Sequence, residues 1–154
     1  AGGTNPRAAL HPVEFVFMTG HTEALGEPSA VSDAASKIRA HCITNNRWLI
    51  DYYDLECYDP DGNYFGDKYI YDNLNYDKYG SKDANWATEY CNANQTGELY
   101  YLTMGDGDTY NGCESCAHSD LTVPGSPRQS TLNCVLKARA AWWLFARIAG
   151  WNGN

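Results

Sequence analysis

Residues 13–19 read VEFVFMT and residues 48–54 read WLIDYYD, and the pattern that joins these two stretches decides the fold. The first stretch is nearly continuously apolar and rich in β-branched and aromatic side chains, as is typical of a strand buried on both faces of a parallel sheet. Residues 29–45 place one apolar face on a helix of about four turns. That face comprises Val31, Ala34, Ala35, Ile38 and Cys42. A strand, a helix and a second strand form a right-handed crossover, so we predict adjacent parallel strands at 13–19 and 48–54.

Residues 130–150 (STLNCVLKARAAWWLFARIAG) are the clearest helix in the chain, with Ser130 as the N-cap and Gly150 as the end. The pattern predicts a wide apolar face that packs on more than one side, against the chain's own sheet or against another chain. The predicted face consists of Leu132, Val135, Ala138, Ala141, Trp142, Phe145, Ile148 and Ala149. This Trp-rich C-terminal helix is therefore a candidate contact in a homo-oligomer or hetero-oligomer.

Shorter elements are predicted between the second strand and this helix. Residues 57–82 are acidic and dense in Tyr, Gly and Asn, which indicates a long insertion. Residues 83–94 predict a helix and residues 98–104 a short strand. The chain of 154 residues suits a single domain spanning residues 1–154. We predict the α/β class with parallel strands.

The chain carries a formal net charge of −8. Nucleic-acid binding is not expected, because it requires a basic surface, and no apolar run reaches the roughly 18 to 20 residues of a membrane span. Fifteen of the nineteen acidic residues fall within residues 51–120, and all twelve tyrosines within residues 52–110. This distribution indicates a solvated acidic surface. Calcium binding and a tyrosine face that stacks on a carbohydrate ligand are the sharper alternatives.

Six cysteines without a complete set of metal ligands predict disulfides and an exported protein of the periplasm, the cell surface or the extracellular space. They are Cys42, Cys57, Cys91, Cys113, Cys116 and Cys134, and the sequence does not choose among their pairings. For Cys113 and Cys116, a haem attachment is disfavoured because Ala117 follows the pair instead of histidine. A redox pair would normally open a helix, and zinc would require two further ligands. A structural disulfide is therefore favoured.

The segment around residues 59–67 carries hard oxygen ligands at alternate positions, as calcium prefers. These candidate ligands are Asp59, Asp61, Asn63 and Asp67. The segment is not an EF-hand, because Tyr64 stands where an EF-hand requires glycine. A Pro-Asp-Gly turn inside a solvated loop is the simpler interpretation. Calcium is the one cofactor that the sequence suggests.

Two histidines are candidate catalytic residues. His118 lies in a polar loop before the C-terminal helix, with Glu114 and Asp120 nearby, and an imidazole on such a loop suits general-base chemistry. His21 follows the first predicted strand, and ligands in open α/β sheets bind beyond the carboxyl ends of the strands. Asp54 and Glu56, at the end of the second predicted strand, are expected at the same edge. The alternatives are a surface histidine at 118 and a turn-capping histidine at 21.

An ordered set of segments resembles the second half of SGNH-type hydrolases, and within that type exported bacterial proteins. The segments are FVFMTGH, IRAHCITNN, WLIDYYDLECYDPDGNY, NWATEY, CAHS and AAWWLFARIAGW. The resemblance implies an esterase-like fold, here a partial three-layer α/β/α structure of the SGNH and flavodoxin-like kind. It also implies activity on acylated carbohydrates and a catalytic role for His118. The chain departs from the family at Ser115, where the family has the aspartate that orients the catalytic histidine. The family's Gly-Asp-Ser nucleophile and its Gly and Asn oxyanion donors have no match here and would precede Ala1.

Two functions from different classes follow. The first is the C-terminal part of a secreted SGNH-like ester hydrolase that lacks the nucleophile half, is inactive alone and works with a companion chain. The second is a non-catalytic extracellular subunit that packs through its Trp-rich helix in a larger assembly. The missing nucleophile favours the second, and the ordered match favours the first.

Overall fold

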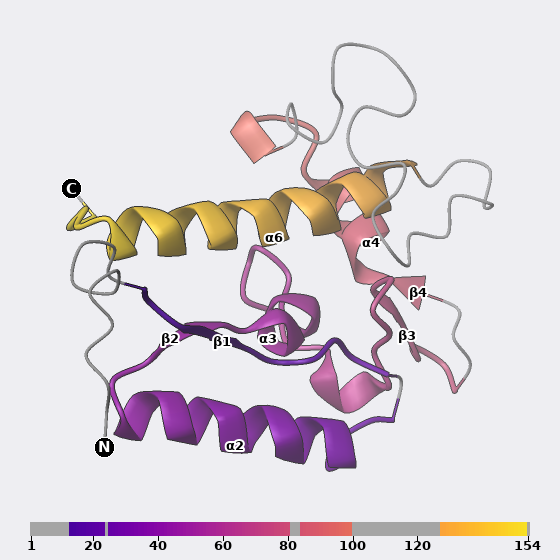
Figure 1. Ribbon diagram of the computed structural model, residues 1–154. Helices are drawn as coiled ribbons and strands as arrows, with labels where there is room; N and C mark the ends of the chain where they lie inside the picture. The colour runs from indigo at the N-terminus through magenta and orange to yellow at the C-terminus, as the bar shows by residue number, and fades with distance from the viewer. Residues whose placement is uncertain (1–12, 24, 81–83, 100–126, 154) are drawn as a thin grey trace, which may run out of the picture.

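The computed structural model describes residues 13–23, 25–80, 84–99 and 127–153, without the side chains of residues 127–131. Strands and helices alternate at first, and short elements follow before a long C-terminal helix (Figure 1). The elements are β1 (Val16–Met18), α2 (Ala30–Thr44), β2 (Trp48–Ile50), α3 (Tyr52–Cys57), the 3-10 helix η1 (Gly66–Lys68), β3 (Asn75–Tyr76), β4 (Ala84–Asn85), α4 (Trp86–Ala93) and α6 (Pro127–Ile148).

The predicted β-α-β unit is confirmed. β1 and β2 pair in parallel, with Phe17 opposite Leu49, and α2 connects them. α2 begins at a capping box in which the side chains of Ser29 and Ser32 bond each other's backbone N–H groups. Figure 1 shows α2 and α6 on opposite sides of the two strands. The protein is therefore a mixed α/β structure in which the parallel pair lies between two helices.

The second strand is shorter than the predicted range of 48–54. It ends at Ile50, and α3 begins at Tyr52. Asp51 causes the change, because its carboxylate accepts a hydrogen bond from Asp54 N at 3.2 Å and caps the new helix. The prediction of a short strand at 98–104 was also wrong where it can be compared, because Glu98 and Leu99 are helical.

The predicted insertion at residues 57–82 supplies much of the hydrophobic core. Trp86 of α4 is almost fully buried, and its ring stacks on Phe65 with centroids 6.0 Å apart. The insertion contributes Phe65, Ile70, Leu74 and Tyr76 to a cluster completed by α2, α3, α4 and α6. Among the described residues of this segment, some large apolar side chains therefore lie in the core, and others lie exposed on the acidic surface.

α6 buries only part of its predicted face. Leu132 and Leu144 are buried, and the helix contacts β2, α3 and α4. Trp142 is 76% exposed, and Trp143 and Phe145 are more than half exposed. The inward face includes the polar residues Asn133 and Lys137, which find partners there. Neither α6 nor any other described helix is long and apolar enough to cross a membrane.

The prediction that all six cysteines are oxidised was wrong for three of them. Cys42, Cys57 and Cys91 are buried thiols. Cys57 is inaccessible to solvent, and burial raises the pKa of its thiol, so it packs as a small apolar side chain. Cys134 is disulfide-bonded, as predicted. Cys113 and Cys116 lie outside the described residues.

Candidate functional site

Thr19 joins the carboxyl ends of the two parallel strands. Its backbone N–H donates to Ile50 O at 3.2 Å, and its hydroxyl donates to Asp51 Oδ1 at 2.9 Å. The same hydroxyl oxygen accepts a hydrogen bond from Tyr53 N at 3.0 Å, and Thr19 is buried. These bonds fix the edge of the sheet beyond which open α/β folds bind their ligands.

His21 lies directly beyond this edge, with its side chain about half exposed. Its Nδ1 is 2.9 Å from the carbonyl oxygen of Thr22 and 3.7 Å from Asp72 Oδ2. A carbonyl oxygen only accepts hydrogen bonds, so the contact requires the proton on Nδ1. The neutral ring then carries its lone pair on Nε2. This tautomer is the one that a general base uses when a group at Nδ1 orients it.

Two backbone contacts of the segment around Asp72 place this residue beside His21. Glu23 and Tyr71 form an isolated antiparallel bridge, which places the chain after His21 beside the chain before Asp72. On the other side, the buried Asn133 of α6 donates from Nδ2 to the Asp72 backbone oxygen at 3.0 Å. The carboxylate of Asp72 is mostly buried, at 17% exposure. Backbone pairing and α6 thus hold it beside the imidazole.

A buried ion pair between Glu56 and Lys137 supports the segment that carries the histidine. Glu56 of α3 is inaccessible to solvent, and its Oε2 accepts hydrogen bonds from the N–H and the hydroxyl of Thr22, at 2.7 and 2.9 Å. Its Oε1 accepts a hydrogen bond from Lys137 Nζ at 2.5 Å. Trp86 Nε1 donates to the backbone oxygen of Glu56 at 2.9 Å. The residue that follows His21 is therefore anchored to α3, and through Glu56 to α6.

The charges around His21 favour its protonated form. The pKa of His21 is raised, first by the hydrogen bond to the Thr22 carbonyl and then by the negative charges of Asp72, Glu56 and Glu23. Partial burial opposes this effect without reversing it. The pKa of Glu56 is also raised, because burial outweighs the stabilisation of its charge by Lys137 and Thr22.

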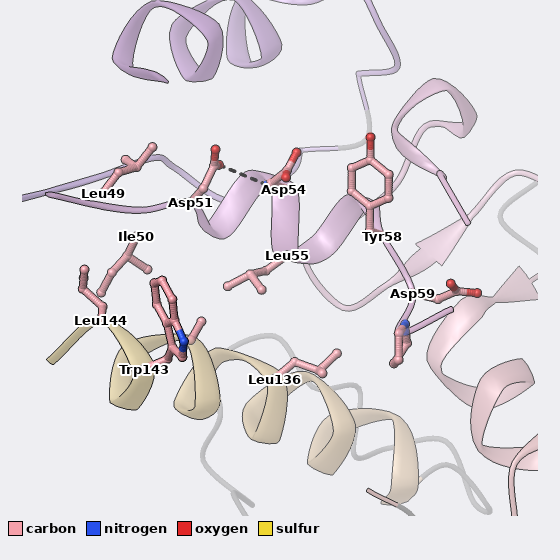
Figure 2. A pocket seen from close by; sticks show the side chains of 12 residues that line it. Leu49, Ile50, Asp51, Asp54, Leu55, Tyr58, Asp59, Leu136, Trp143 and Leu144 are labelled. Carbon is pink, nitrogen blue, oxygen red and sulfur yellow. Dashed lines mark hydrogen bonds between the residues drawn. The ribbon is translucent and has the colours of Figure 1, made fainter. Parts of the chain in front are cut away.

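Asp54 does not belong to this cluster, although the sequence placed it there with Glu56. Arg39 of α2 binds the carboxylates of Asp51 and Asp54 instead. Figure 2 shows both carboxylates pointing away from α6, on the α3 side of a cavity of about 470 Å³. Its lining is mainly apolar and includes Ile50 and Leu136. The acidic groups here are occupied by Arg39 and by the α3 N-terminus, so the acid–base candidates remain at His21.

The predicted calcium loop is a turn that satisfies its own hydrogen bonds. Asp59 Oδ1 accepts from Asp61 N at 3.0 Å and from Asn63 N at 2.8 Å, and Asp59 Oδ2 accepts from Asn63 Nδ2 at 2.8 Å. Asp67 lies in η1 and is exposed. Among the residues with described positions, no group of three or more His, Cys, Asp or Glu side chains is arranged to hold a metal ion. Calcium binding at this loop stays a prediction.

The structure brings together His21 and Glu56 of the predicted residues, and His118 lies outside the described ranges. Sequence reasoning missed Asp72 and Lys137. Asp72 is one acid among many in its segment, and nothing local distinguishes it. Lys137 offered a weak signal, as a charged residue that directly follows the apolar residues Cys134, Val135 and Leu136 of α6. No family model, curated protein or solved structure matches this chain.

Proposed function

We propose that this chain supplies the histidine-bearing part of an SGNH-type ester hydrolase, with the nucleophilic serine on polypeptide outside these 154 residues. In this proposal His21 Nε2 accepts the proton of the serine hydroxyl as the oxygen attacks the ester carbonyl. The Thr22 carbonyl, which accepts the Nδ1 proton, orients His21, and Asp72 is the nearby carboxylate that stabilises its positive charge. His118, which the resemblance implicates, is the second candidate base.

One observation carries the proposal: an imidazole with an assigned Nδ1 proton lies 3.7 Å from a carboxylate at the carboxyl edge of a parallel pair. The departure at Ser115 removes the family's orienting aspartate, and Asp72 offers a carboxylate from elsewhere in the chain. The three-layer fold of the family is part of the proposal, supported by the placement of α2 and α6 on opposite sides of the strands. Acylated carbohydrates are the proposed substrates.

Export to an oxidising compartment is also proposed, and the disulfide of Cys134 supports it. The buried thiols Cys42, Cys57 and Cys91 are compatible with it, because they are inaccessible to exchange.

Active-site labelling of the native protein tests the proposal. A fluorophosphonate probe should label a serine in material isolated from its source, and intact mass should show that this serine lies outside residues 1–154. His21→Gln should reduce labelling by about 10²-fold or more, as expected for loss of a general base. His41→Gln is the matched control, because His41 is an exposed histidine on α2 whose ring contacts Phe17 in a tilted arrangement. Equal labelling of both variants would remove His21 from the mechanism.

A non-catalytic extracellular subunit is the second candidate. The exposed tryptophans near the C-terminal end favour it, since Trp142 and Trp143 of α6 and Trp151, which follows the helix, line an apolar hollow of about 720 Å³. Apolar surface of this kind is characteristic of a contact with another molecule. Native material without any fluorophosphonate-reactive serine, but with a stable companion protein, would favour this second function.

A further inference from the structure

Two tyrosine rings lie exposed side by side on the hairpin that follows α3. Tyr58 and Tyr64 form an isolated antiparallel bridge, and their ring centroids are 4.9 Å apart with a tilt of 47°. Tyr58 is 40% exposed and Tyr64 is 36% exposed, and Figure 2 shows Tyr58 pointing away from α6. Side chains alternate along a strand, so the neighbouring Cys57 and Phe65 point the other way and are buried. The hairpin therefore presents an aromatic pair on a buried base.

Several contacts fix the position of this pair. At the tip of the hairpin, the Asp59 carboxylate accepts three local hydrogen bonds. The Tyr64 hydroxyl donates to Glu27 Oε2. The Tyr64 ring also lies across the backbone of Gly66, where a Cβ atom would come within 2.2 Å of the Tyr64 hydroxyl oxygen, so this position requires glycine. Rings that are already held in place lose little conformational entropy when a ligand binds them.

Glu27 adds hydrogen-bonding capacity beside the rings. The residue is exposed, and its Oε1 accepts a hydrogen bond from the Tyr53 hydroxyl at 2.8 Å while its Oε2 accepts the one from Tyr64. A carboxylate has about four acceptor positions, so Glu27 can accept from further donors. An aromatic surface and a charged acceptor are thus in direct contact.

A third exposed ring lies on the same loop as Glu27. Tyr69 is 50% exposed, and it contacts Gly26, where a Cβ atom would lie 3.0 Å from the ring. Tyr64 and Tyr69 therefore contact adjacent residues of one loop. Tyr69 has a φ of 54°, in the left-handed region that is rare for a bulky side chain. Backbone strain of this kind persists where the surrounding structure holds it, and it is concentrated at ligand sites.

We propose that Tyr58, Tyr64 and Tyr69, together with Glu27, form a tyrosine surface that binds a neutral oligosaccharide. The C–H groups on the face of a sugar ring carry partial positive charge, and the face of an aromatic ring is negative, so the two stack. The sugar hydroxyls donate to the carboxylate in charge-assisted hydrogen bonds. Three separate rings suit a ligand of several sugar units.

Charge and ring geometry disfavour two other classes of ligand. An acidic polysaccharide would meet Glu27, Asp59 and Asp61 on a chain with a net charge of −8. An organic cation such as choline is bound where the faces of several rings surround one centre. Tyr58 and Tyr64 contact each other instead, with centroids 4.9 Å apart, and leave no space for a cation between them.

Titration calorimetry of the native protein with cellohexaose, xylohexaose, mannohexaose and chitohexaose tests the proposal, and at least one of them should bind. Tyr58→Ala should weaken this binding by about tenfold or more, whereas Tyr58→Phe keeps the ring and should bind within about twofold of the natural protein. Tyr79→Ala is the matched control and should bind normally, because Tyr79 is 80% exposed and lies beside Lys78 on another segment. Binding of none of the hexasaccharides, unchanged binding by Tyr58→Ala, or binding of choline alone would overturn the proposal.

Hydroxyl-radical footprinting of the same protein tests whether the tyrosine surface is open to a ligand. Tyr58 and Tyr64 should be oxidised readily in the folded protein, as Tyr79 is, and unlike the buried Tyr53. The bound hexasaccharide should slow the oxidation of Tyr58 and Tyr64 and leave that of Tyr79 unchanged. If Tyr58 and Tyr64 are as unreactive as Tyr53, another part of the protein covers them and the proposal is wrong.

The tyrosine surface does not depend on the proposed function, because none of its residues belongs to the histidine site. Fluorophosphonate labelling separates the two. Hexasaccharide binding by a native protein without a reactive serine supports the tyrosine surface and refutes the hydrolase. A labelled serine in a native protein that binds no hexasaccharide supports the hydrolase and refutes the tyrosine surface.

Discussion

The ammonium group of Lys137 lies 2.5 Å from the carboxylate of Glu56, which is inaccessible to solvent and 81 residues away in sequence. This pair joins α6 to α3, and through the bonds of Thr22 it also fixes the segment that carries His21. The candidate site is therefore built on two helices as well as on the ends of the strands. The stability of the site therefore depends on the ion pair between the buried Glu56 carboxylate and Lys137.

Lys137→Met should lower the free energy of unfolding by about 3–5 kcal/mol, because it leaves the Glu56 carboxylate buried without its cation. Chemical denaturation measures this change. Lys78→Met is the matched control, because Lys78 makes a similar contact with Glu89 at 2.7 Å on the surface, where solvent screens the pair and its loss should change stability far less. Equal losses in the two variants would show that the Glu56–Lys137 pair is not buried as described.

His21 should titrate above its ordinary pKa of 6.5, and Asp72→Asn should lower that pKa. A raised pKa in the folded state means that protonation of His21 favours folding. This contribution is complete below the unfolded pKa and is lost as the pH rises through the folded pKa. The stability difference between the natural protein and His21→Gln should therefore be larger at pH 5.5 than at pH 8.5. NMR titration of the imidazole gives the pKa directly, and a value below 6.5 would contradict the assigned surroundings.

Trp86→Ala should cost about 3–5 kcal/mol in the isolated chain, because Trp86 is buried in the core against Phe65. Trp142→Ala should change stability by about 0.5 kcal/mol or less, because Trp142 is 76% exposed. Thermal or urea unfolding of both variants distinguishes the core from the exposed face of α6. A large loss of stability in Trp142→Ala would show that Trp142 is packed, as the sequence predicted for α6.

Asp59→Ala should destabilise the turn at residues 59–63 by about 1 kcal/mol, because its carboxylate accepts three local hydrogen bonds. Melting with and without a chelator tests calcium in the same experiment. Bound calcium would raise the melting temperature of the natural protein and not that of Asp59→Ala. A melting temperature that a chelator leaves unchanged would contradict the calcium prediction.

The β1–α2–β2 unit could be predicted because its signals are local: apolar runs at the strands and one apolar helix face between them. α3 could not, because its cap Asp51 is held by Thr19 and Arg39, residues that only the fold brings near. The orientation of α6 was predicted only in part, for a similar reason. The apolar periodicity predicted that Trp142 lies on the packed face of the helix. Lys137 faces inward instead, because it pairs with the buried Glu56.

The candidate site, too, could be predicted from the sequence only in part. His21 was predicted from its position after a strand, since the carboxyl ends of parallel strands form one edge. Asp72 was not, because the bridge between Glu23 and Tyr71 that brings it to His21 joins segments 48 positions apart. Sequence spacing alone does not predict that pairing.

Hydrolysis of a small acyl ester is the measurement that tests the central claim most directly. The isolated 154-residue chain should show no turnover above buffer, because its sequence has no match to the family's Gly-Asp-Ser nucleophile or to its Gly and Asn oxyanion donors, one of which alone is worth on the order of 10²- to 10³-fold in rate. The native protein with its serine-bearing part should turn the ester over, with a rate that rises as His21 deprotonates and that His21→Gln abolishes. Robust turnover by the isolated chain, or native turnover unaffected by His21→Gln, would contradict the account.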